Sequence, residues 1–149
     1  MKVAYRTIAS LIALGVVFQA AVIAFGVFES MDTGIAIEGG PDQPILGARL
    51  HSLGGTGVIP ILALLLLIFS FFAKVHGGTK WALFLLLAVV VQILLGGFGF
   101  ELPALGLLHG ANAFVVLTLA VAAARAAKPV HAAASAPAEQ VAPSAAGVD

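Results

Sequence analysis

Two similar segments of the chain each carry one histidine at the same point. They read PILGARLHSLGG from residue 44 and PALGLLHGANAF from residue 103, and their Leu-His pairs contain His51 and His109. Imidazole is a common metal ligand and can also accept or release a proton. The chain has no cysteine, which excludes thiolate metal sites, disulfides and a cysteine nucleophile.

The composition places this histidine pair in a membrane protein. Of the 149 residues, 61% are hydrophobic and 9% are charged, and the mean hydropathy is +1.12. Soluble domains have about 25% charged residues, so a chain this apolar belongs in a lipid bilayer. The formal net charge is zero, which gives no indication of a nucleic-acid partner.

Four apolar segments predict an all-α four-helix bundle that spans the membrane. They cover residues 7–28, 47–73, 81–99 and 105–124, and each approaches the roughly 20 residues that a helix needs to cross a bilayer. Pro60 is expected to kink the second segment. Residues 1–6 form a short N-terminus before the bundle at 7–125. The tail at 126–149 is rich in Ala, Pro and Ser and is predicted to be disordered.

The charges predict that both termini face the cytoplasm. Basic residues flank the segments at one side of the bundle: Lys2, Arg6, Lys74, Lys80, Arg125 and Lys128. Acidic residues occupy the connections at the other side: Glu29, Asp32, Glu38, Asp42 and Glu101. Positive charges favour the cytoplasmic side, and only Arg49 lies on the opposite one. The alanine-rich composition of the tail is typical of a GC-rich bacterial genome, which predicts a bacterial cytoplasmic membrane.

The two histidine segments are part of a longer internal repeat. The first and third apolar segments read VVFQAAVIAFGVF and VVVQILLGGFGFE, and the repeat then continues into the histidine segments. The aligned pairs are Gln19 with Gln92, Phe25 with Phe98, Gly26 with Gly99, Pro44 with Pro103, Gly47 with Gly106 and His51 with His109. A helix pair used twice in one orientation predicts a pseudo-twofold axis along the membrane normal.

This symmetry predicts that the two histidines face each other across the bundle. Each lies about four residues into its segment, which corresponds to the same depth in the membrane. Small or polar residues share a helix face with them: Gly47, Gly54 and Gly55 with His51, and Gly106 and Asn112 with His109. Such a groove has room for a flat cofactor, and two facing imidazoles are the ligands that a haem b would use.

Each of these residues also has a structural interpretation. The glycines can serve close helix packing, with the histidines hydrogen-bonded between helices. Gln19 and Gln92 can contact a cofactor or a ligand histidine, or can bond between helices. Asn112 has the same two alternatives. Arg49 can pair with a haem propionate at the mouth of the site or extend to the lipid headgroups.

The pattern VVVQILLGGFGF…LGLLHGANAF resembles the second helical hairpin in one four-helix half of haem A synthase, and GARLHSLGG resembles the first histidine-bearing helix. Small four-span bacterial proteins show a similar pattern. The resemblance covers about residues 7–125 and implies that His51 and His109 are axial haem ligands. It does not imply oxidation of a haem methyl group. The chain matches one half only, it has no cysteines, and Ala48 stands where the catalytic half has an acidic residue.

The sequence thus favours a membrane protein that binds haem b for electron transfer or haem handling. A quinol or a redox protein is the expected partner, within a homodimer or a larger membrane complex. Whether it is an enzyme stays open. The alternative is a structural or accessory subunit of a membrane complex that has no cofactor. A transporter is disfavoured because the apolar segments hold few ionisable residues, and a hydrolase because no matching motif occurs.

Overall fold

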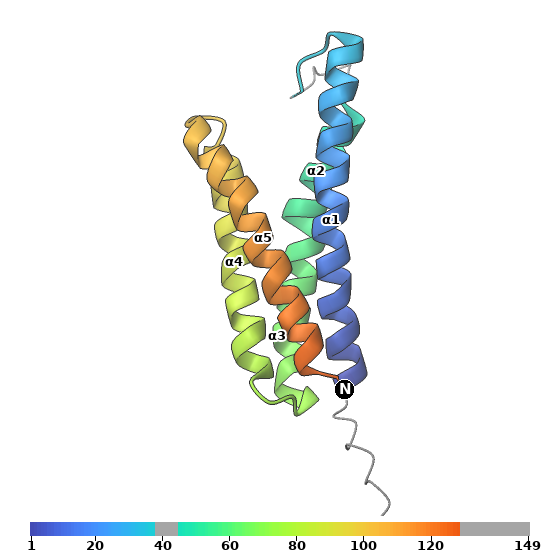
Figure 1. The fold of residues 1–149 in the computed structure, drawn as a ribbon, viewed down its shortest axis with the longest axis vertical. Helices are drawn as coiled ribbons and strands as arrows, with labels where there is room; N and C mark the ends of the chain where they lie inside the picture. Colours follow the sequence, from blue (N-terminus) through green and yellow to red (C-terminus); the bar gives the residue numbers. More distant parts are fainter. Residues whose placement is uncertain (38–44, 129–149) are drawn as a thin grey trace, which may run out of the picture.

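The computed structural model describes residues 1–37 and 45–128, which form helices and contain no β-strand. The elements in chain order are α1 (Lys2–Thr33), α2 (Leu46–Leu53), the π-helical turn η1 (Gly54–Val58), α3 (Ile59–Ala73), α4 (Gly78–Phe98) and α5 (Pro103–Ala126). Because α2, η1 and α3 are continuous, the described residues form four long helices, arranged as in Figure 1. The predicted all-α fold is confirmed.

All four long helices are long and apolar enough to cross a membrane. They contain 32, 28, 21 and 24 residues, and the mean hydropathy of their most apolar windows lies between 1.9 and 2.5. Large apolar side chains point outward along them, such as Phe71 at 66% exposed and Phe114 at 72% exposed. Apolar surface of this extent is stable against lipid but not against water, as expected of a multi-pass membrane protein.

The helices extend beyond most of the apolar segments because backbone hydrogen bonding continues into polar residues. Helix α1 runs to Thr33 and ends where Gly34 takes a left-handed conformation, with φ of 69°. Helix α5 begins with Pro103 in its first turn, where the missing N–H costs nothing. Pro44, Glu38, Asp42, His131 and the tail from residue 129 lie outside the described residues.

A π-helical turn occurs where Pro60 was expected to produce a kink. Pro60 lies in the first turn of α3, immediately after η1. Proline has no N–H to donate to the preceding turn, and the GGTGV sequence of η1 offers little side-chain resistance to a wider turn. The local disturbance is therefore a change of hydrogen-bond pattern along one continuous helix, and π-turns are frequent at functional sites.

The four long helices pack together at one end of the molecule and separate at the other. The end at which they pack together is called the closed end, and it contains the start of α1, residues 74–77 and the end of α5. The other end is called the open end, and it contains residues 34, 46 and 99–102. In the closed half, α1 contacts α3 and α5, and α4 contacts α3 and α5. Alanine is common among the buried residues there, which lets the helices approach closely.

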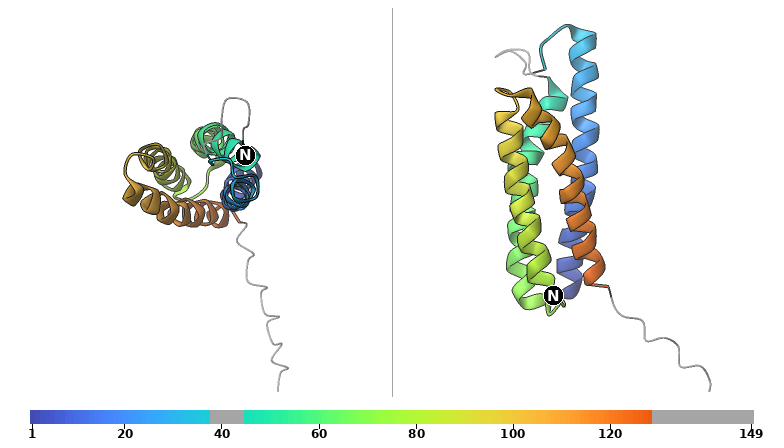
Figure 2. Two further views of the ribbon diagram at one scale, coloured as in Figure 1. Left: turned by 90° about the horizontal axis from the view of Figure 1, so that it is seen from above. Right: turned by 60° about the vertical axis from the view of Figure 1, so that its left-hand side comes forward.

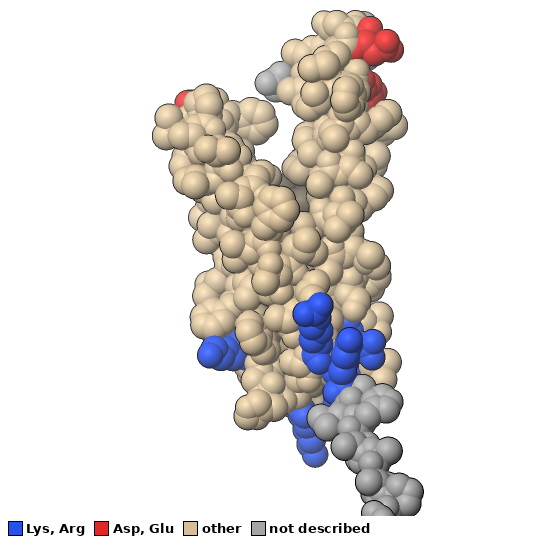
Figure 3. Space-filling model, in the orientation of Figure 1, with Lys and Arg blue, Asp and Glu red and all other residues tan. Residues whose placement is uncertain are grey.

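Towards the open end the bundle divides into two arms. The first arm consists of the second half of α1 with α2, and the second arm consists of the second half of α4 with the start of α5. Figures 1 and 2 show the arms diverging, and the space-filling view in Figure 3 shows an opening between them. On the face drawn in Figure 3, basic side chains gather at the closed end and acidic ones at the open end.

Candidate functional site

The structure brings His51 and His109 together between the two arms. Their ring centroids lie 6.0 Å apart and their planes are inclined by 64°. His51 belongs to α2 of the first arm and His109 to α5 of the second, and both side chains are half-buried. Two histidines that are 58 positions apart in the chain therefore face each other at one depth of the bundle.

Both rings are oriented by the same kind of hydrogen bond. Nδ1 of His51 lies 3.1 Å from the carbonyl oxygen of Gln19, and Nδ1 of His109 lies 2.9 Å from the carbonyl oxygen of Gln92. A carbonyl oxygen can only accept, so each Nδ1 carries the hydrogen and donates it. This assigns the lone pair to Nε2 in both rings, the arrangement that metal-bound histidines use.

A polar network surrounds Nε2 of His109. The amide nitrogen of Gln92 lies 3.2 Å from this Nε2 and can donate to it. Nδ2 of Asn112 donates to Oε1 of Gln92 at 2.8 Å and to the carbonyl oxygen of Ala88 at 2.9 Å. Asn112 therefore fixes the orientation of the Gln92 amide. This orientation places the amide nitrogen, a donor, next to Nε2 of the imidazole. One connected set of hydrogen bonds thus joins Gln92 of α4 to His109 and Asn112 of α5.

The surroundings of His51 contain a buried acceptor without a partner. Gln19 on α1 is only 8% exposed, and its Oε1 makes no hydrogen bond with any described residue. Its amide packs against Gly54, where a methyl group would overlap it, and Oε1 would lie 3.6 Å from a methyl group on Gly55. An unpaired buried acceptor costs about 1–3 kcal/mol, which a donor from a bound molecule or a water would offset.

Gly96 on α4 is required by the position of His109. A methyl group on Gly96 would lie 2.9 Å from Cε1 and from Nδ1 of the His109 ring, closer than real contacts of this type. Sequence reasoning did not assign Gly96 to the site. The signal was present, because Gly96 lies four residues after Gln92 and therefore on the same face of the helix.

Other glycines join the helices within each arm. A methyl group on Gly47 would overlap the backbone of Gly26, and one on Gly99 would lie 3.1 Å from the backbone of Gly106. Gly47 and Gly54 thus occupy close contacts with α1, the packing role of small residues between membrane helices. The alignment predicted from the sequence pairs Gly26 with Gly99 and Gly47 with Gly106, the same four glycines that form these two contacts.

The first arm is also held by a charged cap that sequence reasoning missed. The two carboxylate oxygens of Glu29 accept hydrogen bonds from the backbone N–H groups of Leu46 and Gly47, both at 3.1 Å. These are orphan donors at the start of α2, where a negative charge is favourable. The sequence feature that could have predicted this cap is an acidic residue at the end of α1, close in sequence to the predicted second helix.

Arg49 is exposed on α2, two residues before His51. Its two interpretations, a contact to an acidic cofactor edge and extension to the headgroups, both suit an exposed side chain. Among the described residues there is also no group of three or more His, Asp or Glu side chains that could hold a metal ion. The two imidazoles are thus the principal ligands that this site offers.

Comparison of the chain with protein-family models, with curated proteins and with solved structures finds no match.

Proposed function

We propose that the protein binds haem b between His51 and His109 and transfers electrons in the membrane. The observation that carries this proposal is the matched pair of rings, each fixed through Nδ1 by a backbone carbonyl and facing the other at 6.0 Å. Metal-bound histidines commonly donate their second ring N–H in this way, because the bond fixes the tautomer and strengthens Nε2 as a ligand.

The spacing of the rings fits two ligands on opposite faces of one metal. Bonds between a metal and an imidazole nitrogen are about 2 Å long, so the centroids of two such rings are on the order of 6 Å apart. The observed value is 6.0 Å. A bare ion needs more ligands than two imidazoles, and the described residues supply no third. A tetrapyrrole would bring four nitrogen ligands of its own, so His51 and His109 would be sufficient to hold its metal.

The opening between the arms gives a flat molecule a route to this pair. The arms diverge towards the open end, as Figures 1 and 3 show, and each arm carries one of the two histidines. Nε2 of His109 would hold the iron only with the Gln92 amide turned away, because the amide nitrogen lies 3.2 Å from this Nε2. The Gln92 amide, a hydrogen-bond donor, would lie beside a bound haem on the His109 side, and Gln19 would lie near the His51 side.

Two axial histidines favour electron transfer over oxygen chemistry. His51 and His109 would together hold the iron, and a haem held in this way would have no free site for oxygen or a substrate. What the haem supplies is a one-electron carrier, and the chain supplies its ligands, their orientation and an apolar surrounding. The electron partner is a quinol or a redox protein that approaches from the open end.

A tandem repeat of one helix pair is part of the proposal, and the core supports it. The buried residues Tyr5, Ala9 and Ile12 of α1 have the same spacing as Gly78, Ala82 and Leu85 of α4. The buried residues Ile59, Ala63 and Leu66 of α3 match Val116, Ala120 and Ala123 of α5 in the same way. The copies differ at η1, since α5 has no π-helical turn.

Two contacts support a pseudo-twofold axis through the centre of the bundle. Equivalent residues of two copies can touch each other only near the axis that relates them. The Tyr5 hydroxyl donates a buried hydrogen bond of 2.8 Å to the carbonyl oxygen of Gly78, its equivalent 73 positions later. His51 and His109 are the second such pair. An axis along the membrane normal would place the haem site on the symmetry element.

The distribution of charge supports an orientation with the closed end in the cytoplasm. The closed end carries Lys2, Arg6, Lys74, Lys80, Arg125 and Lys128, and the open end carries Glu29, Asp32 and Glu101. Positive residues are retained on the cytoplasmic side. Both termini would then be cytoplasmic in a bacterial cytoplasmic membrane, and the haem site would lie towards the outer leaflet. A homodimer or a larger membrane complex suits this arrangement.

A cofactor-free accessory subunit is the second candidate, and one observation favours it. Every polar atom of the His109 ring already has a partner within the described residues, through the carbonyl and the amide of Gln92. A satisfied histidine of this kind can join α4 to α5 without any ligand. The close contact to Gly96 is explained equally well by both candidates.

Titration of the detergent-purified, haem-free protein with haemin separates the two candidates. The proposal predicts a sharp absorption band that saturates at one haem per chain, with both histidines required. His76→Ala, which changes an exposed histidine at the closed end, is the matched control and should bind normally. Unsaturable binding, or binding that survives in the double variant His51→Ala/His109→Ala, would favour the cofactor-free subunit.

A further inference from the structure

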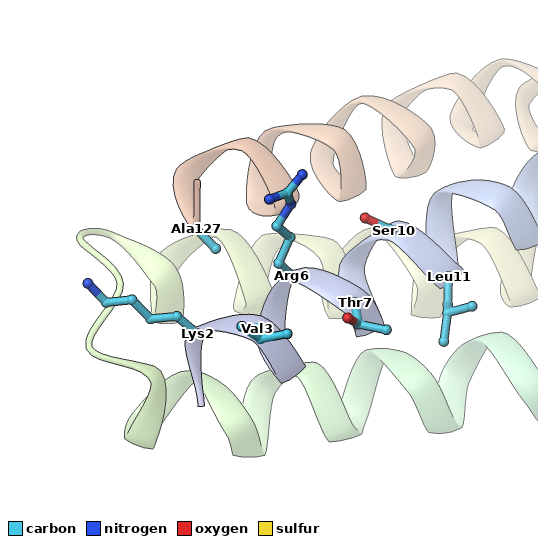
Figure 4. Close-up of a pocket in the computed structure, with 7 residues that line it drawn as sticks. All are labelled: Lys2, Val3, Arg6, Thr7, Ser10, Leu11 and Ala127. Carbon is cyan, nitrogen blue, oxygen red and sulfur yellow. The ribbon is translucent and has the colours of Figure 1, made fainter. Parts of the chain in front are cut away.

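A pocket lies at the closed end, far from the histidine pair, on the side of α1 that faces the end of α5. It encloses about 510 Å³. Figure 4 shows its lining, which consists of Lys2, Val3, Arg6, Thr7, Ser10, Leu11 and Ala127. All of these residues except Ala127 belong to the first turns of α1. The pocket thus sits at the junction of the two helices that begin and end the bundle.

The lining combines cations, hydroxyl groups and an apolar wall. Lys2 and Arg6 lie one helical turn apart, and Thr7 and Ser10 add hydroxyl groups further along α1. Val3 and Leu11 are large apolar side chains at 79% and 46% exposed. Cations and hydroxyls next to exposed apolar surface match a molecule that has an anionic, oxygen-rich head and apolar chains.

Charge favours an anion in this pocket. Among the described residues its lining contains two cations and no acidic residue, and the basic residues Arg125 and Lys128 lie close to Ala127 in the chain. The acidic residues of the described part of the chain, Glu29, Asp32 and Glu101, belong to the open end. Figure 3 shows the basic side chains gathered at the closed end. The potential at the pocket is therefore positive.

We propose that this pocket binds the headgroup of an anionic phospholipid, with the phosphate at Arg6 and Lys2 and the acyl chains along Val3 and Leu11. The position of the pocket supports lipid as the source of the phosphate. It lies at the end of a membrane-spanning helix, where the headgroups are, and its apolar wall continues into the lipid-facing surface of α1. Basic pockets between membrane helices bind anionic headgroups elsewhere by the same combination of forces.

Native mass spectrometry of the detergent-purified full chain tests the proposal, with dioleoyl phosphatidylglycerol and dioleoyl phosphatidylcholine as probes. The anionic lipid should bind roughly tenfold more tightly than the zwitterionic one. Arg6→Gln and Lys2→Gln should each weaken its binding about fivefold, the effect of one cation near a membrane surface. Thr7→Phe keeps every charge and fills the pocket, and it should also abolish preferential binding.

Lys80→Gln is the matched control, because Lys80 is a closed-end cation that lies over Phe84 on α4 and does not line the pocket. It should leave lipid binding unchanged. Equal losses in Lys80→Gln and Arg6→Gln would show a general attraction to the closed end and overturn the proposal. Complete displacement of the lipid by inorganic phosphate would instead identify a site for a free anion. Helical content measured by circular dichroism identifies any variant that fails to fold.

Discussion

The imidazole rings of His51 and His109 face each other across the two arms with their centroids 6.0 Å apart. Neither arm holds both rings, so the relative position of the arms sets this distance. Each ring is fixed within its own arm by a hydrogen bond to a glutamine carbonyl. The hydrogen bond that fixes each ring, and with it the tautomer, therefore does not depend on the distance between the arms.

Carbon monoxide should distinguish a fully ligated iron from an open one. The proposal predicts that the reduced wild-type protein loaded with haem shows no spectral change with carbon monoxide, because His51 and His109 would both hold the iron. His51→Ala should leave one position open, and its reduced spectrum should then shift on addition of the gas. A shift of equal size in the wild-type protein would contradict two-histidine ligation.

Gly96→Ala should displace the His109 ring. The added methyl group would lie 2.9 Å from two atoms of the ring, so either the ring or helix α4 has to move. We expect haem retention to fall several-fold, since a ligand misplaced by a few tenths of an ångström loses its bond geometry. Gly97→Ala is the matched control, because a methyl group at Gly97 meets nothing within 4 Å. The haem content of the two purified variants measures the difference.

Gly47→Ala should separate α2 from α1. The methyl group would overlap the backbone of Gly26, which cannot move aside as a flexible side chain can. Overpacking of this kind costs about 1–3 kcal/mol, so the thermal midpoint measured in detergent should fall. Gly57→Ala lies in the same span and has open space around it, and it should leave the midpoint nearly unchanged. Equal midpoints for both variants would argue against the close contact.

Glu29→Ala should loosen the start of α2. The variant leaves the N–H groups of Leu46 and Gly47 without their acceptors. Loss of a cap costs about 1 kcal/mol, which corresponds to roughly fivefold faster amide exchange at these positions. Hydrogen exchange followed by mass spectrometry measures this rate. Asp32→Ala, at the same end of α1, is the control, and equal acceleration in both variants would indicate a general effect of lost charge.

The fold could be predicted from the sequence because the relevant signals are local. Four apolar segments near 20 residues long indicate four helices, and the structure has four helices at those places. The helix ends could not be predicted as well, since Glu29, Ser30 and Thr33 continue α1 through backbone hydrogen bonds that hydropathy does not detect. The π-helical turn before Pro60 could not be predicted either, because the same segment can form an α-helical or a π-helical hydrogen-bond pattern.

The candidate site could be predicted in part because of the internal repeat. The matched positions of His51 and His109 indicated that both lie at the same depth in the membrane. The small residues on the same helix face as each histidine indicated a groove beside them. The sequence left open whether Gly47 and Gly54 line a groove or pack closely against another helix, and it did not indicate that Gly96 makes space for His109. Such contacts depend on the rotation of each helix about its own axis, and in helices that are apolar on all sides that rotation leaves little trace in the sequence.

The measurement that tests the central claim most directly is a reduced-minus-oxidised absorption spectrum of the protein purified from cells supplied with haem. We predict the spectrum of a low-spin b-type haem in the wild-type protein and its loss in both His51→Ala and His109→Ala. The same spectrum should persist in His76→Ala. A colourless wild-type protein, or an unchanged spectrum in either ligand variant, would contradict a haem held between these two histidines.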